Sequence, residues 1–220
     1  MRFALLDGQR VEASPKLRAS CPGCGGEVVS KCGKHITWHW AHLSRTHCDQ
    51  WWEPETEWHR AWKNRFPREW QEIPALDAIT GDLHIADVKT AARLVIEFQR
   101  STIEVDEVRA REDFYKTMVW VVGGCKNYAD RFNFSNMRSR PNQDGIAQFQ
   151  WFGRSTLFKR WHTTTPVFID FGPEHGFWRT LRFDPNTKRG IAGLVDIDGF
   201  VQLASSGTTD FTSVGGPASV

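Results

Sequence analysis

The chain has 220 residues, 40% of them hydrophobic and 25% charged, a globular composition with room for one ordinary domain and a small one. Its formal net charge of +2 does not by itself indicate a nucleic-acid partner, although a local patch can still be strongly basic. The N-terminal apolar run is too short for a signal peptide, and no run approaches the ~18 residues of a membrane span. We therefore expect a soluble cytoplasmic protein without a membrane partner, whose five cysteines are metal ligands or free thiols.

Residues 1–50 predict a small domain built on a metal site. In Cys21-Pro-Gly-Cys24, two thiolates can bend round one zinc ion, because the glycine allows a tight turn. The sequence also predicts a small β-hairpin at 2–6 and 9–13, and the two strands of a zinc-ribbon hairpin at 27–31 and 35–40. A ribbon of this size cannot bury a sufficient core, so structural Zn²⁺ would supply its folding energy.

The second pair of zinc ligands stays open at this point. His39 and His42 repeat the spacing of the cysteine pair and are the first choice, while Cys48 is the alternative. A redox C-x-x-C pair or a chance cluster is the competing interpretation. The number of potential ligands within 28 residues favours zinc: Cys21, Cys24, His35, His39, His42, His47 and Cys48.

A helix is predicted between residues 54 and 67, where large apolar residues recur at helical spacing and a proline stands at each end. Glu55, His59 and Lys63 are spaced by four and run along one edge of the apolar face, whereas Glu57 points nearly opposite. Either the first three form a ladder in solvent, or Glu55 reaches an active site on the strands that follow.

These strands are predicted at 70–79, 82–90 and 93–99. Because side chains alternate along a strand, Asp87 and Lys89 share a face, as do Glu97 and Gln99. If the last two strands pair, Asp87 and Glu97 are neighbours, and neighbouring carboxylates resist burial unless a cation or proton joins them. Their oxygens, with a neighbouring carbonyl, suit Mg²⁺. The competing interpretation is two carboxylates on a half-exposed sheet.

A helix at 104–116 and a buried strand at 118–122 complete an order of helix, three strands, helix and strand. Beyond them, residues 125–204 predict a β-rich extension that begins with a polar excursion at 127–144, and residues 205–220 predict a flexible tail. Strands of the extension are expected at 147–152, 166–171 and 177–183. Basic and aromatic residues alternate near residues 151–162. They either bind single-stranded nucleic acid or form an ordinary amphipathic surface. They are Trp151, Arg154, Lys159, Arg160, Trp161 and His162.

Six motifs follow one another between residues 20 and 122: Cys21-Pro-Gly-Cys24, His39-Trp-Ala-His42, Glu55-Thr-Glu-Trp-His59, Ala86-Asp-Val88, Glu97-Phe-Gln-Arg-Ser101 and Arg111-Glu-Asp-Phe-Tyr115. The ordered set resembles the competence protein CoiA family, whose nuclease domain belongs to the PD-(D/E)XK superfamily. The resemblance implies an α/β (α+β) fold with a restriction-endonuclease-like PD-(D/E)XK core at 51–124, after the N-terminal zinc ribbon.

The resemblance also implies a deoxyribonuclease that depends on Mg²⁺ or Mn²⁺ and acts in DNA uptake, recombination, repair or phage-related processing. Asp87, Glu97 and the carbonyl of Phe98 would hold the metal, which would activate water for attack on a phosphodiester. Glu55 would complete the metal shell or orient water. Gln99 takes the place of the superfamily's usual lysine.

Charges around this site are expected to complete it. Lys89 would supply the charge that Gln99 lacks, and Arg111 and Tyr115 would face phosphate or buttress the metal-binding glutamate. His59 and Lys63 are further expected DNA contacts. The alternative is a DNA-binding module with a weak or silent nuclease fold, and a third possibility is a zinc-stabilised adaptor for recombination, competence or phage proteins.

Overall fold

The computed structural model describes residues 1–44, 48–51, 53–77, 80–152, 156–161 and 165–211. The chain divides into two compact units, Met1–Lys89 and Thr90–Val220, and each is described by itself. The boundary falls between Asp87 and Glu97, so the two carboxylates expected to share a site belong to different units. Among the described residues no helix is both long and apolar enough to cross a membrane.

The first unit begins with a five-stranded antiparallel sheet in the order β2-β1-β3-β4-β5. Its strands are β1 Phe3–Leu6, β2 Gln9–Glu12, β3 Arg18–Ser20, β4 Glu27–Lys31 and β5 His39–His42. The β1–β2 hairpin turns at Asp7 and Gly8, both at positive φ (50° and 77°), a combination that suits the twist of two paired strands. A small apolar core lies against this sheet and contains Met1, Ala4, Ala13, Cys21, Val28 and Trp40.

The rest of the first unit is one short helix and a strand pair. It consists of α1 Glu57–Lys63, the 3₁₀ turn η1 Arg68–Trp70, and the antiparallel strands β6 Gln71–Leu76 and β7 Leu83–Lys89. The helix begins two residues later than Glu55, because the Thr56 side chain accepts a hydrogen bond from the His59 amide and caps it. It also ends before Pro67, which precedes η1 instead.

The second unit contains six strands in the order β10-β13-β12-β11-β9-β8. β8 pairs parallel with β9, and β9 parallel with β11, while the remaining pairs are antiparallel. The elements in chain order are β8 Val95–Gln99, α2 Val105–Tyr115, β9 Met118–Gly123, α3 Tyr128–Met137, β10 Ile146–Gln150, α4 Leu157–Arg160, β11 Val167–Asp170, β12 Phe177–Asp184, β13 Arg189–Val195 and α5 Ile197–Ser206.

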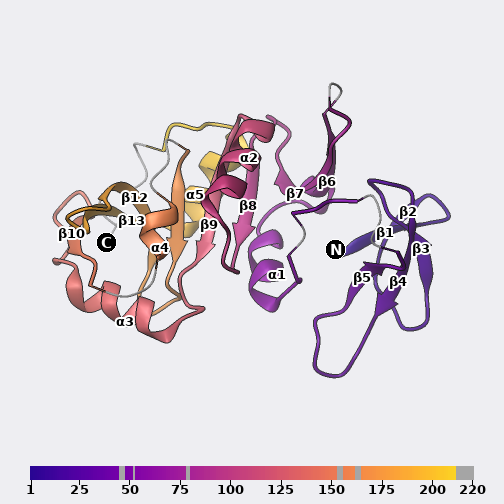
Figure 1. The fold of residues 1–220 in the computed structure, drawn as a ribbon, viewed down its shortest axis with the longest axis horizontal. Helices are drawn as coiled ribbons and strands as arrows, with labels where there is room; N and C mark the ends of the chain where they lie inside the picture. The colour runs from indigo at the N-terminus through magenta and orange to yellow at the C-terminus, as the bar shows by residue number, and fades with distance from the viewer. Residues whose placement is uncertain (45–47, 52, 78–79, 153–155, 162–164, 212–220) are drawn as a thin grey trace. The chain divides into compact units, whose positions relative to one another are not determined.

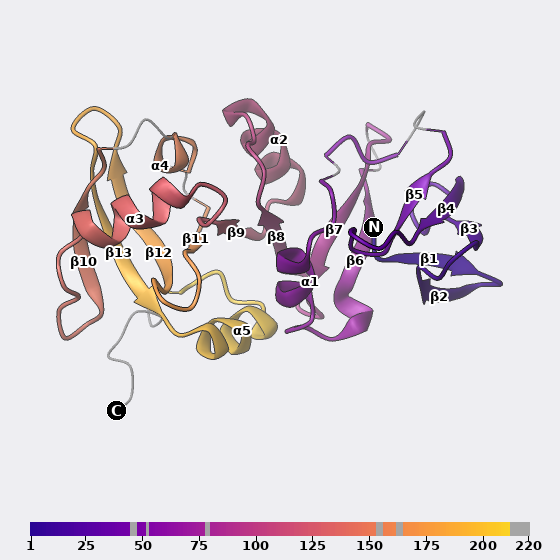
Figure 2. The same ribbon diagram turned by 90° about the horizontal axis from the view of Figure 1, so that it is seen from below.

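Aromatic residues fill both faces of the β10–β13 region. On one face, Phe134 of α3 stacks on Phe171 with ring centroids 4.5 Å apart and lies 5.8 Å from Phe158 of α4. On the other face, Phe200 of α5 packs against Phe168 and Phe211, at 4.7 and 5.6 Å. Figures 1 and 2 show α4 and α5 on opposite sides of these strands. This core belongs wholly to the second unit.

Several expectations about the C-terminal third need correction. The polar stretch 127–144, expected to be an excursion, contains helix α3, capped by Asn127, whose side chain accepts a hydrogen bond from Ala129 N. Trp151 and Trp161 are 0% and 3% exposed, so they are core residues rather than stacking platforms for a nucleic acid. The expected flexible tail begins inside α5, and Phe211 is fully buried. Arg154, His162 and residues 212–220 lie outside the described residues.

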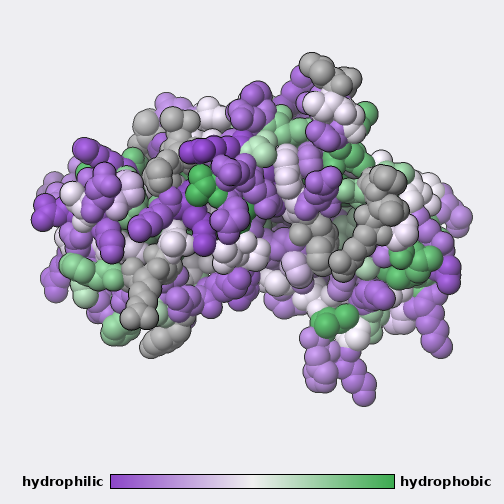
Figure 3. Space-filling model, viewed as in Figure 1, coloured by the Kyte–Doolittle hydropathy of each residue, from purple (hydrophilic) through white to green (hydrophobic). Residues whose placement is uncertain are grey.

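The elements of the central region occur in the expected order, as α1, β6, β7, β8, α2 and β9. The molecule is thus a mixed α and β structure. The face of the protein seen in Figure 3 is mostly hydrophilic, with hydrophobic residues in small separate patches.

Candidate metal centre and carboxylate clusters

Four potential metal ligands of the first unit come together at one end of the ribbon. The ligand atoms of Cys21, Cys24, His42 and Cys48 all lie within 4.8 Å of one another. Cys21 Sγ is 3.7 Å from Cys48 Sγ, and Cys24 Sγ is 3.3 Å from His42 Nε2. Three thiols and one imidazole are a donor set typical of structural zinc sites.

The local chain path explains how the two cysteines of the C-x-x-C motif converge. The amide of Cys21 donates to Gly26 O at 2.8 Å, and the amide of Gly25 donates to Cys21 O at 3.0 Å, which closes a tight loop. Gly25 has φ +70°, a conformation that a side chain would strain. The amides of Gly23 and Gly26 point at the sulfurs of Cys21 and Cys24, each at 3.4 Å. Such amides stabilise thiolate charge.

The two residues that complete the cluster of potential ligands are His42 and Cys48, and His39, the first choice from spacing, is outside the group. His39 and His42 both lie in β5, three residues apart, and side chains at that separation point to opposite faces of a strand. His39 Nδ1 lies 2.8 Å from Thr37 O instead. Two residues separated by a two-residue gap can converge on one ion in a turn, but in a strand they point to opposite faces. His35 is exposed on the loop before β5, and His47 lies outside the described residues.

Zinc fits this cluster by distance as well as by donor type. With Zn–S near 2.3 Å and tetrahedral angles, two sulfur ligands should be about 3.8 Å apart, and a sulfur and a nitrogen about 3.6 Å. The separations of 3.7 and 3.3 Å lie close to these values. The cluster could therefore bind zinc with little movement of its side chains.

Burial disfavours the charged form of three of the four residues: Cys21, His42 and Cys48. Burial raises the pKa of Cys21, and burial also raises the pKa of Cys48 to about 12, with the neighbouring Cys21 adding to the effect. Burial lowers the pKa of His42. A zinc ion would have to displace thiol protons here, and the affinity would rise with pH.

A second cluster in the first unit surrounds the buried ammonium of Lys63. Its Nζ lies 2.9 Å from Glu55 Oε2, 3.0 Å from Glu72 Oε1 and 3.0 Å from Asp87 Oδ1. Burial alone would lower the pKa of Lys63, but the charges of Asp87, Glu72 and Glu55 outweigh it and raise that pKa well above its ordinary value. Glu55 and Lys63 therefore belong to a buried ion cluster and not to the ladder in solvent that their spacing allowed.

Glu72 ties this cluster to the first residues of the chain. Its carboxylate accepts hydrogen bonds from the amides of Arg2, at 2.7 Å, and Phe3, at 2.9 Å. Burial opposes ionisation of Glu72, but the charge of Lys63, the N-terminal ammonium and these amides lower its pKa to about 2. Glu72 is therefore a buried anion with several partners.

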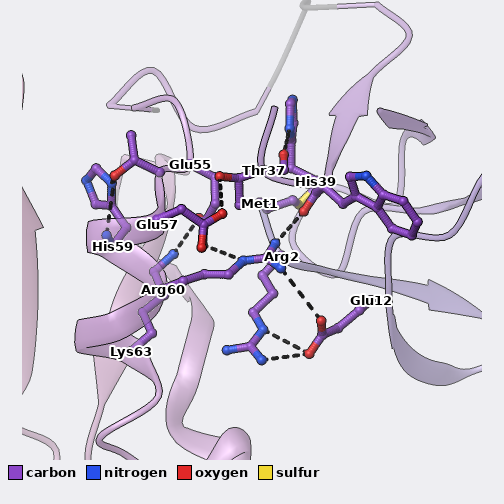
Figure 4. A network of polar contacts seen from close by, with 12 residues as sticks. Met1, Arg2, Glu12, Thr37, His39, Glu55, Glu57, His59, Arg60 and Lys63 are labelled. Atoms are coloured by element: carbon purple, nitrogen blue, oxygen red, sulfur yellow. Dashed lines mark hydrogen bonds and ion pairs between the residues drawn. The ribbon is translucent and has the colours of Figure 1, made fainter. Parts of the chain in front are cut away.

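The two candidate glutamates before and in α1 differ in their surroundings. The Glu55 side chain is 4% exposed and, as Figure 4 shows, turns toward Arg60 and Lys63. Glu57 is exposed and accepts a hydrogen bond from Thr37 Oγ1 at 2.7 Å. Of the two, only Glu55 joins the cluster that contains Asp87.

His59 and Lys63, expected to contact DNA, lie inside the unit rather than on its surface. Each is 3% exposed. His59 Nε2 is 3.2 Å from Glu53 Oε2, and its Nδ1 is 2.8 Å from Thr56 Oγ1. Neither side chain faces solvent, where a phosphate would approach.

In the second unit, β8 carries the other predicted carboxylate. Glu97 is 4% exposed, and its Oε2 accepts a hydrogen bond from Arg111 Nη1 of α2 at 3.0 Å. Arg111 also contacts Glu107, with Nε 3.1 Å and Nη2 2.5 Å from its Oε1. Of the two roles expected for Arg111, the geometry shows the contact with Glu97.

Gln99 shares the strand face of Glu97 and is 3% exposed. Its Nε2 donates to Ser101 Oγ at 3.1 Å, whereas its Oε1 has no hydrogen-bond partner among the described residues. A buried acceptor without a partner costs about 1–3 kcal/mol. This oxygen is therefore suited to a water, a metal ion or a substrate donor that the protein itself does not supply.

The remaining predicted residues fall around these clusters. Burial alternates along β7, so Lys89 and Asp87 lie on the same partly exposed face, two residues apart. Phe98 is buried at 2%, and Tyr115 is half-buried at the end of α2, in an edge contact with Phe114.

Two features escaped the sequence analysis. Glu72 gave no signal, because its partners at Arg2 and Phe3 are about 70 residues away. Asp49 accepts hydrogen bonds from Ile85 N at 3.0 Å and contacts His84 Nδ1 at 2.9 Å, which ties the residue after Cys48 to β7. A carboxylate directly after a metal ligand is a signal that could have drawn attention to Asp49.

Comparison with known proteins gives a match to a family model. Residues 8–50 match the family model described as the competence protein CoiA, N-terminal domain. The matched segment contains all four residues of the candidate zinc cluster. Neither the search of curated proteins nor the search of solved structures found a match.

Proposed function

We propose that the protein is a metal-dependent deoxyribonuclease, with its catalytic metal bound at β8 and a structural zinc in the N-terminal ribbon. The observation that carries the proposal is the pair on one face of β8. There a buried carboxylate, Glu97, lies two residues from a buried acceptor, Gln99 Oε1, that has no partner in the described part of the chain. Oxygen atoms of this kind are what Mg²⁺ and Mn²⁺ prefer.

Glu97 and the carbonyl of Phe98 would hold the metal, and Gln99 Oε1 would accept a hydrogen bond from a metal-bound water or bind the ion itself. When bound, the metal supplies Lewis-acid activation of the phosphate and of a water. Arg111 holds Glu97 in place from α2, because a guanidinium suits a carboxylate. DNA is the proposed substrate, as the resemblance to nucleases of the CoiA family implies.

The first unit contains the two other carboxylates expected at a catalytic site, Asp87 and Glu55, in a cluster of its own. Both carboxylates contact the ammonium of Lys63, Glu55 at 2.9 Å and Asp87 at 3.0 Å.

Cleavage of labelled single- and double-stranded DNA with added Mg²⁺ or Mn²⁺ tests the proposal. Glu97→Gln should lower the cleavage rate by about a hundredfold or more, because a metal ligand is worth several kcal/mol in the transition state. Asp87→Asn tests the carboxylate cluster of the first unit, where a comparable loss would give Asp87 a catalytic role. Glu107→Gln is the matched control, since Glu107 contacts the same arginine but is 37% exposed. Folding of each variant is checked by circular dichroism.

Glu55→Gln and Glu57→Gln extend the test to α1. A large loss is expected for the first and little for the second, because only Glu55 joins the Asp87 cluster. Full activity of Glu97→Gln, or equal losses for Glu97→Gln and Glu107→Gln, would contradict a metal at β8.

A DNA-binding module without catalysis is the second candidate function. The contact that favours it is the ion pair of Asp87 with Lys63, because a catalytic cation would have to share this carboxylate with an ammonium 3.0 Å away. In that case DNA would bind without Mg²⁺-dependent cleavage, and Asp87→Asn would bind DNA as the wild type does, also without cleavage.

A further inference from the structure

The loop between β4 and β5 presents large apolar side chains to solvent. Ile36 is 49% exposed and Trp38 is 44% exposed. We refer to residues 31–38 as the Trp38 loop. It projects at the lower right of Figures 1 and 3, where a small hydrophobic patch is surrounded by hydrophilic residues. An exposed tryptophan on a projecting loop stabilises no core, so its placement calls for another explanation.

The loop is held in shape although it is exposed. Trp38 Nε1 donates to Gly33 O at 3.2 Å and closes the loop from within. Thr37 Oγ1 donates to Glu57 at 2.7 Å, and the Arg60 guanidinium donates to Trp38 O, so α1 supports the base of the loop. A ligand that stacks on Trp38 would therefore find the ring already ordered and would lose less entropy on binding.

The charged residues of the segment that carries this ring have one sign. The sequence from Val28 to Cys48 contains no aspartate or glutamate. Lys34 and His35 of the loop are exposed, as is Lys31, the last residue of β4. The Glu57 carboxylate contacts the loop at its base, where it accepts a hydrogen bond from Thr37. Basic side chains around an exposed aromatic ring are the pattern that binds single-stranded nucleic acid, phosphates on the cations and a base on the ring.

We propose that the Trp38 loop binds single-stranded DNA by stacking a base on Trp38 while Lys31 and Lys34 contact its phosphates. A single strand fits better than a duplex, because duplex bases are stacked on one another and do not offer a free face. The inference rests on the proposed function only in taking DNA as the substrate. It requires no catalysis.

Binding of a fluorescent 20-nucleotide oligothymidine to the full chain, purified with zinc and assayed by anisotropy without Mg²⁺ or Mn²⁺, tests the inference. Trp38→Ala should weaken binding about fivefold to a hundredfold, the range for loss of one base stack. Trp38→Phe should restore most of the affinity. Phe152→Ala is the matched control, because Phe152 is also an exposed aromatic, at 65%, but lies outside the loop.

The double variant Lys31→Ala/Lys34→Ala probes the phosphate contacts without touching an apolar residue. The slope of log affinity against log salt should fall by about 1.4, since each phosphate contact on a single strand contributes about 0.7. Unchanged binding by Trp38→Ala, an equal loss in Phe152→Ala, no binding by the wild type, or preference for a duplex competitor would each overturn the inference.

The cleavage assay keeps this inference separate from the proposed function. Trp38-dependent binding without cleavage would leave the loop assigned and remove the nuclease. Cleavage by the wild type, together with unaltered DNA binding by Trp38→Ala, would support the nuclease and remove the assignment of the loop.

Discussion

The Lys63 ammonium contacts carboxylates from three segments: one before α1, one in β6 and one in β7. Helical spacing identified Glu55, His59 and Lys63 as one edge of a helix, which is close to their arrangement. Spacing could not say whether that edge faces water or the interior, because the other two carboxylates come from strands later in the chain. The difference in energy is large, since an exposed ion pair is worth at most about 1 kcal/mol and breaking a buried one costs several.

Lys63→Met tests whether the ion cluster is buried in solution. The change should lower the free energy of unfolding by about 3–5 kcal/mol, because it leaves buried carboxylates without their cation. Lys116→Met is the matched control, since Lys116 is 73% exposed and pairs with Asp113 at 3.3 Å. Its effect should stay below about 1 kcal/mol in the same urea titration. Similar midpoints for the two variants would mean that Lys63 is hydrated in solution.

Among the elements, β7 connects the zinc cluster to the carboxylate cluster. Asp49, next to Cys48, binds the Ile85 amide and His84, and Trp51 stacks on the His84 ring with centroids 3.2 Å apart. Leu83 lies beside Gly23 of the C-x-x-C motif, where a Cβ added to the glycine would come within 3.1 Å of Leu83 Cδ2. Asp87 follows on the same strand. The ribbon and the β6–β7 pair are therefore parts of one packed unit.

Strand β6 carries the pH dependence of that unit through Glu72. Its pKa of about 2 in the folded protein lies below the ordinary 4.5, so its contribution to stability is present above pH 4.5 and is lost as the pH falls toward 2. Glu72→Gln should be less stable than wild type by on the order of 2–3 kcal/mol at pH 6, and the difference should shrink between pH 4.5 and 2. Thermal unfolding of both proteins across pH 2–6 measures it. A difference that is constant with pH would show that Glu72 acts by shape rather than by charge.

For the whole molecule, periodicity predicted the strands from β6 to β9 to within a few residues, because their apolar and polar residues alternate or run unbroken. It missed α3, whose Asn, Asp and Arg residues read as a loop although Phe134 anchors the helix in an aromatic core. It also assigned Trp151 and Trp161 to a possible DNA surface, because composition does not reveal which aromatics face inward. Cys48 was left open against His39 because the face of β5 decides between them.

Because the two units divide between Lys89 and Thr90, we expect loss of zinc to affect the first unit and not the second. Cys21, Cys24, His42 and Cys48 belong to the first unit, together with α1, β6 and β7, whereas the aromatic core around Phe134 and Phe168 belongs to the second. Removal of zinc by a chelator, or the change Cys48→Ser, should therefore loosen the ribbon and also β7, which is tied to it through Asp49. Strands β11 to β13, packed on their own aromatic core, should keep their protection.

Hydrogen exchange followed by mass spectrometry, with and without the chelator, separates these regions. Amides of β4, β5 and β7 should exchange at least tenfold faster after zinc removal, since a structural zinc contributes several kcal/mol of folding energy. Peptides from β11 to β13 should be unchanged, and His39→Ala serves as the control because His39 lies in β5 outside the ligand group. Protection of β7 that survives chelation would show that the strand pair is stable without the metal. Loss of zinc in His39→Ala would return that histidine to the ligand set.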